Sequence, residues 1–446
     1  MPYHRIFSHF STAVCFLFCS QLNAAEITLD LEQRFQTMAG WEVTSNLADS
    51  PEDPAWAPYR EELLDRAVSE VGINRIRLEV RSGAESKHGF NQKFIRGDIS
   101  YEDWRPYRYG AENDNDDSHN INWSGFDFSE LDWHVEVAVL PLLKRLEARG
   151  EKLLVNLCYV SFGGAPTFHA DDPEEYAEFA LAVYLHLQKK YGFVPDFWEV
   201  VLEPDHENTG WTGRQMGLVM AVTARRLRAN GFTPKFVAPS VTNMKNATRY
   251  VEEIASVPGA MDDFKELSYH RYGGRKLHIL EDIVQTAERY GLQPAMLEWW
   301  FGKGTYEVLH QDLTVGRNVS WQGQVLGALF EINNETSQII SLKDDAHFNR
   351  QYFLHVRQGA VRIGATSDTW GFEPVAFVNS DGRHVVIIKA VQGGPIVVNG
   401  LPLGRYQISY AIGDYTSGPL SWAEAGPDRP VKTSIPEAGV LTISAK

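Results

Sequence analysis

Short apolar segments alternate with amphipathic, charge-bearing segments from about residue 38 to about residue 343. Several of the apolar segments carry hydrophobic residues on both faces, which is typical of parallel strands buried beneath helices. The predicted strands are residues 38–43, 74–80, 152–160, 197–203, 235–240, 267–272, 295–300 and 338–342. Strand–helix units repeated eight times in about 300 residues predict a TIM (β/α)8 barrel, and a doubly wound sheet is the alternative.

Helices with one apolar face are predicted between these strands. They cover residues 58–70, 140–149, 173–191, 215–230 and 280–290. A glycine follows four of them directly, at Gly150, Gly192, Gly231 and Gly291. Glycine takes the left-handed conformation at low cost, so a glycine just past the last periodic residue indicates the end of a helix.

After about residue 345 the pattern of hydrophobic and polar positions becomes that of short strands separated by turns. These are predicted at residues 375–378, 384–390, 395–398, 406–412 and 440–444, with turn pairs such as Asp381-Gly382 and Asn399-Gly400 between them. The pattern predicts an all-β sandwich over residues 346–446, attached to a barrel over residues 38–345. The strand-like residues 26–37 precede the barrel, and we expect them to join the same sandwich.

One connection of the predicted barrel is far longer than usual. Residues 81–133 follow the second strand and are rich in aromatic and polar side chains. Because connections at the carboxyl ends of barrel strands lie on the catalytic face, we expect this insertion to form part of a cleft. Trp104 and Trp123 are then candidates for substrate contacts. The alternative is an ordered surface excursion without a binding role.

The first residues have the pattern of a secretory signal. His4 and Arg5 precede a short apolar stretch at residues 11–20, and the small residues Ala24 and Ala25 follow it. We predict a signal peptide over residues 1–25 and a secreted or periplasmic protein, with a retained N-terminal helix as the alternative. The apolar stretch is too short to span a bilayer, and no other stretch is long enough.

Charge and cysteine content exclude several classes of function. The chain carries 42 Lys+Arg against 58 Asp+Glu, a formal charge of -16, and a field of that sign repels nucleic acid. Beyond residue 25 the only cysteine is Cys158, which rules out an intrachain disulfide. Histidines are scattered without metal-ligand spacing, and we predict neither a metal nor a cofactor. Residues 113–117 (NDNDD) resemble a calcium loop in composition but lack the EF-hand glycine and terminal glutamate, so they are interpreted as loop.

Two glutamates end predicted barrel strands, and they are the strongest chemical signal in the sequence. Glu203 ends the fourth strand, where Pro204 follows, and Glu298 lies in the seventh. A lone carboxylate in an apolar strand is costly to bury, so packing alone does not explain two such positions. Parallel strands bring both groups to one face of a barrel. Retaining glycosidases need two carboxyls about 5–5.5 Å apart in this way.

Neighbouring residues fit the same chemistry. Arg77 on the second strand could keep a nucleophile ionised, although it could instead pair only with Glu79. His270 and Tyr272 on the sixth strand could hydrogen-bond the nucleophile or the sugar, and a buried structural histidine is the alternative. Trp299 and Trp300 beside Glu298 offer flat faces for sugar rings, or simply pack in the core.

The residues together resemble clan A of the glycoside hydrolases. Within that clan, residues 34–41 (RFQTMAGW) and 351–363 (QYFLHVRQGAVRI) resemble glycoside hydrolase family 30. The resemblance implies a TIM barrel fused to a β-sandwich, with Glu203 as acid/base and Glu298 as nucleophile. Where the clan usually has an asparagine that binds the sugar 2-hydroxyl, this chain has Leu202. Asn156 on the third strand is a candidate substitute donor.

The sequence therefore predicts a secreted retaining β-glycoside hydrolase that cleaves a polysaccharide or oligosaccharide by double displacement. The aromatic insertion favours an endo-acting enzyme over an exo-acting one. A carbohydrate-binding protein that has lost turnover on the same scaffold, and an inverting enzyme, are the alternatives. Composition does not identify the sugar or its linkage.

Overall fold

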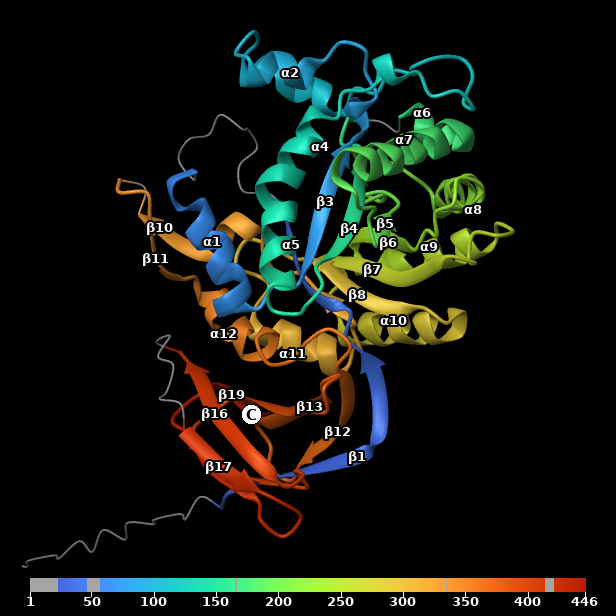
Figure 1. Ribbon diagram of the computed structural model, residues 1–446. Helices are drawn as coiled ribbons and strands as arrows, with labels where there is room; N and C mark the ends of the chain where they lie inside the picture. The colour runs from blue at the N-terminus through green and yellow to red at the C-terminus, as the bar shows by residue number, and fades with distance from the viewer. Residues whose placement is uncertain (1–22, 46–56, 165–166, 334, 414–420) are drawn as a thin grey trace, which may run out of the picture.

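A computed structural model describes residues 23–45, 57–164, 167–333, 335–413 and 421–446. Most of the predicted signal segment, residues 1–22, lies outside the described residues. Figure 1 shows a strand barrel surrounded by helices, with a separate β domain at the end opposite helix α2 (Phe90–Ile95). None of the helices within the described ranges is long and apolar enough to cross a membrane.

The larger part of the molecule is a closed barrel of parallel strands, as the alternating pattern predicts. In order around the barrel they are β2 (Gly40–Thr44), β3 (Arg75–Arg81), β4 (Leu154–Val160), β5 (Phe197–Glu199), β6 (Phe236–Asn243), β7 (Phe264–Gly273), β8 (Gln293–Glu298) and β9 (Ser320–Trp321). The TIM barrel is thus confirmed, and the doubly wound alternative is wrong.

The prediction for the eighth strand is wrong. Residues 338–342 form β11 (Gln338–Leu342), which pairs with β10 (Phe330–Asn333) in an antiparallel hairpin outside the barrel. The barrel is closed instead by β9, whose two residues pair with β8 on one side and β2 on the other. Two residues are too few to give a period, whereas the alternation of β11 belongs to a half-exposed hairpin.

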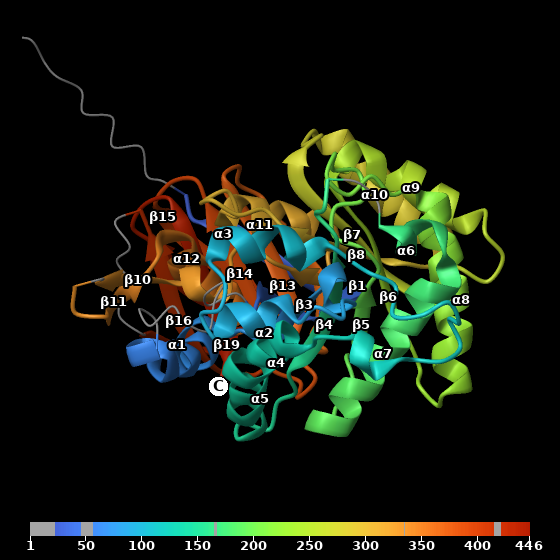
Figure 2. The same ribbon diagram turned by 90° about the horizontal axis from the view of Figure 1, so that it is seen from above.

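Helices cover the outside of the barrel, and Figure 2 shows α7 to α10 gathered on one side of it and α1 and α5 on the other. Their bounds are α1 (Arg60–Arg66), α4 (Ser129–His134), α5 (Leu140–Glu147), α7 (Pro173–Tyr191), α8 (Gly213–Ala229), α9 (Ala247–Ala255), α10 (Leu277–Tyr290) and α11 (Tyr306–Thr314). Helix α7 has the predicted bounds. The Asp172 side chain caps its first backbone N–H groups, and Gly192 ends it in the left-handed conformation with φ 77°.

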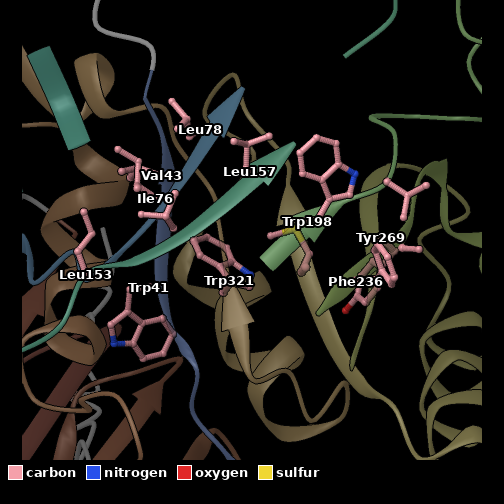
Figure 3. Packing of buried hydrophobic residues seen from close by; sticks show 14 of the residues in the cluster. Trp41, Val43, Ile76, Leu78, Leu153, Leu157, Trp198, Phe236, Tyr269 and Trp321 are labelled. Carbon is pink, nitrogen blue, oxygen red and sulfur yellow. The ribbon is translucent and has the colours of Figure 1, made fainter. Parts of the chain in front are cut away.

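The barrel strands pack apolar side chains outward against the helices, and their inward positions hold charged side chains beside a smaller apolar cluster. Trp41, Ile76, Leu157, Trp198 and Trp321 belong to the large buried core that the strands share with the helices (Figure 3). The neighbouring positions hold buried charges, including Glu42, Arg75 and Glu266. Arg75 on β3 pairs with Glu266 on β7 at 2.7 Å, and because these strands are not neighbours the ion pair crosses the interior.

The β domain is one continuous nine-stranded sheet built from both ends of the chain. Its strands are β1 (Ala25–Thr37), β12 (Val361–Ser367), β13 (Phe372–Val378), β14 (His384–Ala390), β15 (Gly394–Asn399), β16 (Gly404–Ile412), β17 (Ser421–Ala425), β18 (Val431–Ile435) and β19 (Gly439–Ala445). The N-terminal strand β1 lies between β12 and β15, as expected. The edge strands β17 and β18 contact each other, so the sheet curls around its own core.

The long insertion after β3 is folded rather than extended loop. It contains α2 and the short helix α3 (Tyr101–Trp104). Phe94 stacks on Trp104 with ring centroids 4.5 Å apart, and Phe90 stacks on Tyr107 at 3.6 Å. Several of the aromatic residues that made this segment conspicuous in the sequence thus stack on one another within it.

Candidate active site

Two strand ends bring the predicted pair of glutamates together. Glu298 is the last residue of β8, and Glu203 follows β5 by four positions. One carboxylate oxygen of each, together with a ring nitrogen of His270, lies within 4.8 Å of the other two atoms. Their side chains are 11% and 7% exposed for Glu203 and Glu298, respectively. The two carboxyls are therefore close enough to act on one bond and sit in a largely desolvated environment.

Glu298 is held by two hydrogen-bond donors. Arg77 donates from Nη2 to Glu298 Oε2 at 2.6 Å, and the Tyr272 hydroxyl donates to Oε1 at 2.8 Å. Arg77 also pairs with Glu79 at 3.1 Å, so the alternative that it pairs only with Glu79 is wrong. A carboxylate with a donor on each oxygen is fixed in orientation and stabilised as an anion.

Glu203 has a different set of partners. His270 Nδ1 lies 2.8 Å from Glu203 Oε1, which leaves Tyr272 rather than His270 as the partner of Glu298. The backbone at Glu203 has φ 50°, a left-handed conformation that is costly for a residue other than glycine. Backbone strain of this kind clusters at functional sites, because the surrounding structure must impose it. Pro204 follows immediately and offers no backbone N–H to continue the strand.

The charges of Glu298, Glu203, His270 and Arg77 shift one another's pKa values. Burial raises the pKa of Glu298, and the charge of Glu203 raises it further, against the opposing effects of Arg77 and His270. Burial alone would also raise the pKa of Glu203, but the hydrogen bond and charge of His270 lower it overall. Burial alone would lower the pKa of His270, yet the charges of Glu298 and Glu203 raise it. The hydrogen bond and charges between Glu203 and His270 thus oppose the effect of burial on both groups.

Trp300 forms one wall of the site. The Arg77 guanidinium lies 5.4 Å from the centre of its ring, and its indole N–H donates to Gln322 Oε1 at 3.0 Å. Gln322 was not predicted from the sequence, because it follows the two-residue strand β9 that the pattern did not reveal. Trp299 is partly exposed and packs beneath the guanidinium groups of Arg271 and Arg275, 5.9 and 5.2 Å from its ring.

Three candidate substrate-binding residues are not brought to this site. Asn156 is fully buried, and its amide donates to Glu199 at 2.8 Å, so it is not a free donor for a sugar hydroxyl. Trp104 is 1% exposed within the insertion and presents no open ring face. Trp123 is exposed but lines a surface depression formed with α7 and α8 on the outside of the barrel. Aromatic content alone did not distinguish core, outer surface and cleft.

Leu202, where the clan usually has an asparagine, lies in an apolar cluster. Its buried neighbours are Cys158 and Val160 on β4, and Tyr109 and Phe162 pack against them. The residue therefore has hydrophobic surroundings that suit a leucine. An amide at this position would need to find polar partners elsewhere.

A surface pocket is lined by Trp300, which follows Glu298 by two residues in the chain. Its volume is about 450 Å³, and Trp300 lines it together with Phe301, Gln324, Val325 and Lys343. Phe301 is 80% exposed and has a strained backbone with φ 60°. The pocket extends from the wall of the site toward the β10–β11 hairpin, and it offers an aromatic face and polar groups outside the catalytic centre.

The atoms of Glu203, His270 and Glu298 are close enough for metal coordination, but the charges around them fit another role. The Arg77 guanidinium already neutralises Glu298 from inside the barrel, and His270 Nδ1 is engaged by Glu203. A second cation would be repelled by Arg77.

No family model matches the sequence, and no curated protein matches it. Solved structures do match. An endoxylanase of glycoside hydrolase family 30 from Clostridium papyrosolvens has 15% identity, covers 94% of this chain and 100% of its own, and gives a TM-score of 0.66. The catalytic domain of the family 30 xylanase C from Talaromyces cellulolyticus has 13% identity, the same coverage and a TM-score of 0.66. An endo-β-1,6-glucanase has 17% identity, 94% coverage of each chain and a TM-score of 0.67. The resemblance to glycoside hydrolase family 30 is thus confirmed at the level of the fold: a TIM barrel with an attached β domain.

Proposed function

We propose that this chain is a retaining β-glycoside hydrolase that cleaves within polysaccharide or oligosaccharide chains. The observation that carries the proposal is the approach of Glu203 and Glu298 to within 4.8 Å, each with its own set of partners. Retaining enzymes need a separation of about 5–5.5 Å, whereas inverting enzymes need room for a water between the groups, at about 6.5–9.5 Å.

In the first step Glu298 attacks the anomeric carbon while the leaving oxygen receives a proton from Glu203. Arg77 and Tyr272 hold Glu298 as an oriented anion before attack. The new bond forms between a carboxylate oxygen and the sugar, and the glycosidic bond breaks as the leaving oxygen takes the proton. This step removes the negative charge of Glu298, one of the two charges that raise the pKa of His270. A proton on the hydrogen-bonded pair of Glu203 and His270 is then held less tightly, which favours its transfer to the leaving group.

In the second step water replaces the leaving group. Glu203, now without its proton, accepts one from the water, whose oxygen attacks the anomeric carbon and releases Glu298. His270 supports the change of role because its hydrogen bond stabilises the anionic form of Glu203. Two inversions at one carbon leave the product with the configuration of the substrate.

Cleavage within a chain rests on the pocket of about 450 Å³ beside Trp300, which could hold sugar units beyond the scissile bond. The solved structures with this fold include an endoxylanase and an endo-β-1,6-glucanase, which agrees with internal cleavage. Action outside the cytoplasm rests on the signal-like residues 1–25. Screening the purified protein on plant, algal and fungal polysaccharides would identify the sugar and the linkage.

The decisive experiment replaces each glutamate by its amide on a substrate that the wild type cleaves. Glu298→Gln is expected to abolish turnover, and Glu203→Gln to lower it strongly, with partial recovery when azide is added as an external nucleophile. Proton NMR of the first-formed product is expected to show the anomer of the substrate. Intact cleavage in Glu298→Gln, or an inverted first product, would refute the assignment.

The same polysaccharide screen tests the alternative of a carbohydrate-binding protein without turnover. Leu202 is the feature that favours this alternative. That alternative gains support if the wild type binds glycans and cleaves none of them. Analysis of the earliest products distinguishes internal cleavage, which yields mixed oligosaccharides, from exo-action, which yields monosaccharide first.

A further inference from the structure

A second group of acidic side chains lies between the insertion and helix α7, apart from Glu203 and Glu298. Glu85 and Asp114 come from the insertion, and Glu175 and Glu178 from the first half of α7. One carboxylate oxygen from each of Glu85, Asp114 and Glu175 lies within 4.8 Å of the other two. Glu85, Glu175 and Glu178 are 1%, 6% and 1% exposed, so this is a buried cluster and not a solvated acidic face.

Several oxygens of the cluster have no hydrogen-bond partner within the described part of the chain. They are Asp114 Oδ1, Glu175 Oε2 and both carboxylate oxygens of Glu178. An unpaired buried carboxylate is among the most costly arrangements in a folded protein. The cluster therefore needs either protons or a cation.

The remaining oxygens of Glu85 and Asp114 accept hydrogen bonds that fix the positions of these two side chains. Glu85 accepts from the backbone N–H of Asp114 at 3.1 Å through Oε1, while its Oε2 lies 2.7 Å from His169 Nε2. Asp114 Oδ2 accepts from the backbone N–H of Asn122 at 2.5 Å. Gly125 lies so close that a Cβ there would be 2.4 Å from that of Asp114. These contacts fix Asp114 with Oδ2 hydrogen-bonded and Oδ1 without a partner.

We propose that these four carboxylates bind a calcium ion that ties the insertion to helix α7. All the unpartnered atoms are oxygens, and calcium takes six to eight oxygen ligands in flexible geometry. Soft or borderline metals are disfavoured, because both ring nitrogens of His169 are already engaged, by Glu85 and by the Tyr159 hydroxyl. Magnesium fits less well, since it demands near-ideal octahedral geometry and keeps several waters.

The site could not be recognised from the sequence. Of the calcium-like run at residues 113–117, Asp114 contributes its carboxylate to the cluster, and the other carboxylates lie 29 residues before it and more than 60 residues after it. No linear motif connects them, because the fold and not the local chain brings them together. The proposed ion would neutralise the buried charge and anchor the insertion, which begins at the carboxyl end of β3, on the same end of the barrel as Glu203 and Glu298.

Isothermal titration calorimetry of the full chain, stripped with EDTA, tests the proposal without any measurement of glycan cleavage. Titration with CaCl2 is expected to show saturable binding at one site. Saturating calcium is expected to raise Tm by at least about 2 °C relative to EDTA. EDTA is also expected to speed proteolytic cleavage within residues 81–133. No saturable heat up to millimolar calcium, together with an unchanged Tm, would overturn the site.

Variants then assign the binding to these carboxylates. Glu178→Gln and Glu175→Gln are each expected to raise the Kd for calcium by about tenfold or more, because each removes a charged ligand. Glu281→Gln, on the exposed face of α10, is the matched control and is expected to leave the Kd unchanged. Circular dichroism confirms that each variant is folded. Equal calcium affinity in Glu178→Gln, Glu175→Gln and the control would refute the assignment.

Discussion

The Tyr272 hydroxyl donates a hydrogen bond to Glu298, the predicted nucleophile, and removing this hydroxyl tests its role. Tyr272→Phe deletes the hydroxyl that donates to Glu298 at 2.8 Å and leaves the ring in place. A hydrogen bond to a charged group contributes about 1.5–3 kcal/mol, so kcat/KM should fall about 10- to 100-fold. Steady-state kinetics on the cleaved substrate measure the effect.

A matched control is Tyr406→Phe, which removes a hydroxyl that donates to the backbone oxygen of Pro402 in the β domain. This variant should keep kcat/KM within a factor of about two, since surface and remote changes leave the chemistry untouched. If both tyrosine variants behaved alike, Tyr272 would have no part in positioning Glu298.

Leu202 raises a different question at the residue scale, because the related clan usually has asparagine there. Leu202→Asn would place an amide in the apolar cluster with Cys158, Val160 and Phe162. We expect the free energy of unfolding to fall by about 1–3 kcal/mol, the cost of a buried polar group without partners, and kcat/KM not to rise. Urea titration and kinetics measure the two effects, with Leu202→Met as the volume-conserving control. Higher kcat/KM in Leu202→Asn would show instead that the position faces the sugar.

The sequence contained enough information to place Glu203, Glu298 and Tyr272 at one site, because each lies at or near the end of a predicted strand. Arg77 was identified from within the second strand, by its positive charge, which could keep a nucleophile ionised. Asn156 was misjudged for a reason that no single strand reveals: its amide is used by Glu199 on the neighbouring strand. Side chains that cross the barrel interior depend on strand register and tilt, and a linear pattern records neither.

Helix α11 carries a buried histidine that should make the protein sensitive to acid. His310 Nδ1 lies 3.1 Å from the Tyr352 hydroxyl of helix α12 (Asp344–Phe353), and burial, with the charges of Lys389 and Arg362, lowers its pKa to about 3. An unfolded histidine titrates near pH 6.5. Below that pH the unfolded chain takes up a proton that the folded chain does not. Stability is therefore fully present above pH 6.5 and is lost progressively as the pH falls toward 3.

Between pH 7.5 and pH 4.5 this residue should cost about 2–3 kcal/mol of unfolding free energy. Glutamine does not titrate, so the unfolding free energy of His310→Gln should fall by about 2–3 kcal/mol less than that of the wild type between pH 7.5 and pH 4.5. Urea titrations at the two pH values measure the difference. His278→Gln, on the exposed face of α10, should lose as much as the wild type. An equal loss in His310→Gln would show that other groups cause the acid sensitivity.

At the scale of elements, strong periodicity predicted structure well and weak periodicity did not. Helix α7 was predicted with its bounds, because Asp172, Pro173 and Gly192 mark both ends of an amphipathic run. Strand β9 was missed, since closure of the barrel by two residues is a tertiary event. Substrate contacts were expected from Trp104 and Trp123 in the insertion, yet Trp104 stacks on Phe94 and is buried among the insertion's own residues.

The whole molecule is held together by a hydrophobic core that does not stop at the boundary between barrel and β domain. Phe377 and Ile387 from the sheet belong to the same buried cluster as Trp41 and Phe353. The Trp41 ring stacks on Phe353 at 4.4 Å, and its indole N–H donates to the backbone oxygen of Val356 at 2.6 Å. Arg357 adds an ion pair to Glu151 at 2.5 Å. Neither part buries its apolar surface alone, so we expect the two to unfold together.

The inner core of the sheet offers a way to test that coupling. Phe372 is buried in the second cluster, which the sheet forms on its own side away from the barrel. Phe372→Ala should cost about 3–5 kcal/mol, the usual effect of removing a buried aromatic ring. If the molecule unfolds as one unit, the midpoint reported by tryptophan fluorescence should fall as far as the midpoint reported by far-ultraviolet circular dichroism, with equal calorimetric and van't Hoff enthalpies. Ten of the twelve tryptophans lie within residues 38–345, so the fluorescence reports mainly on the barrel. Independent domains would give a second transition, with the tryptophan signal left at its wild-type midpoint. Because the shared core joins strands from both ends of the chain, we expect a single transition in the wild type and in the variant alike.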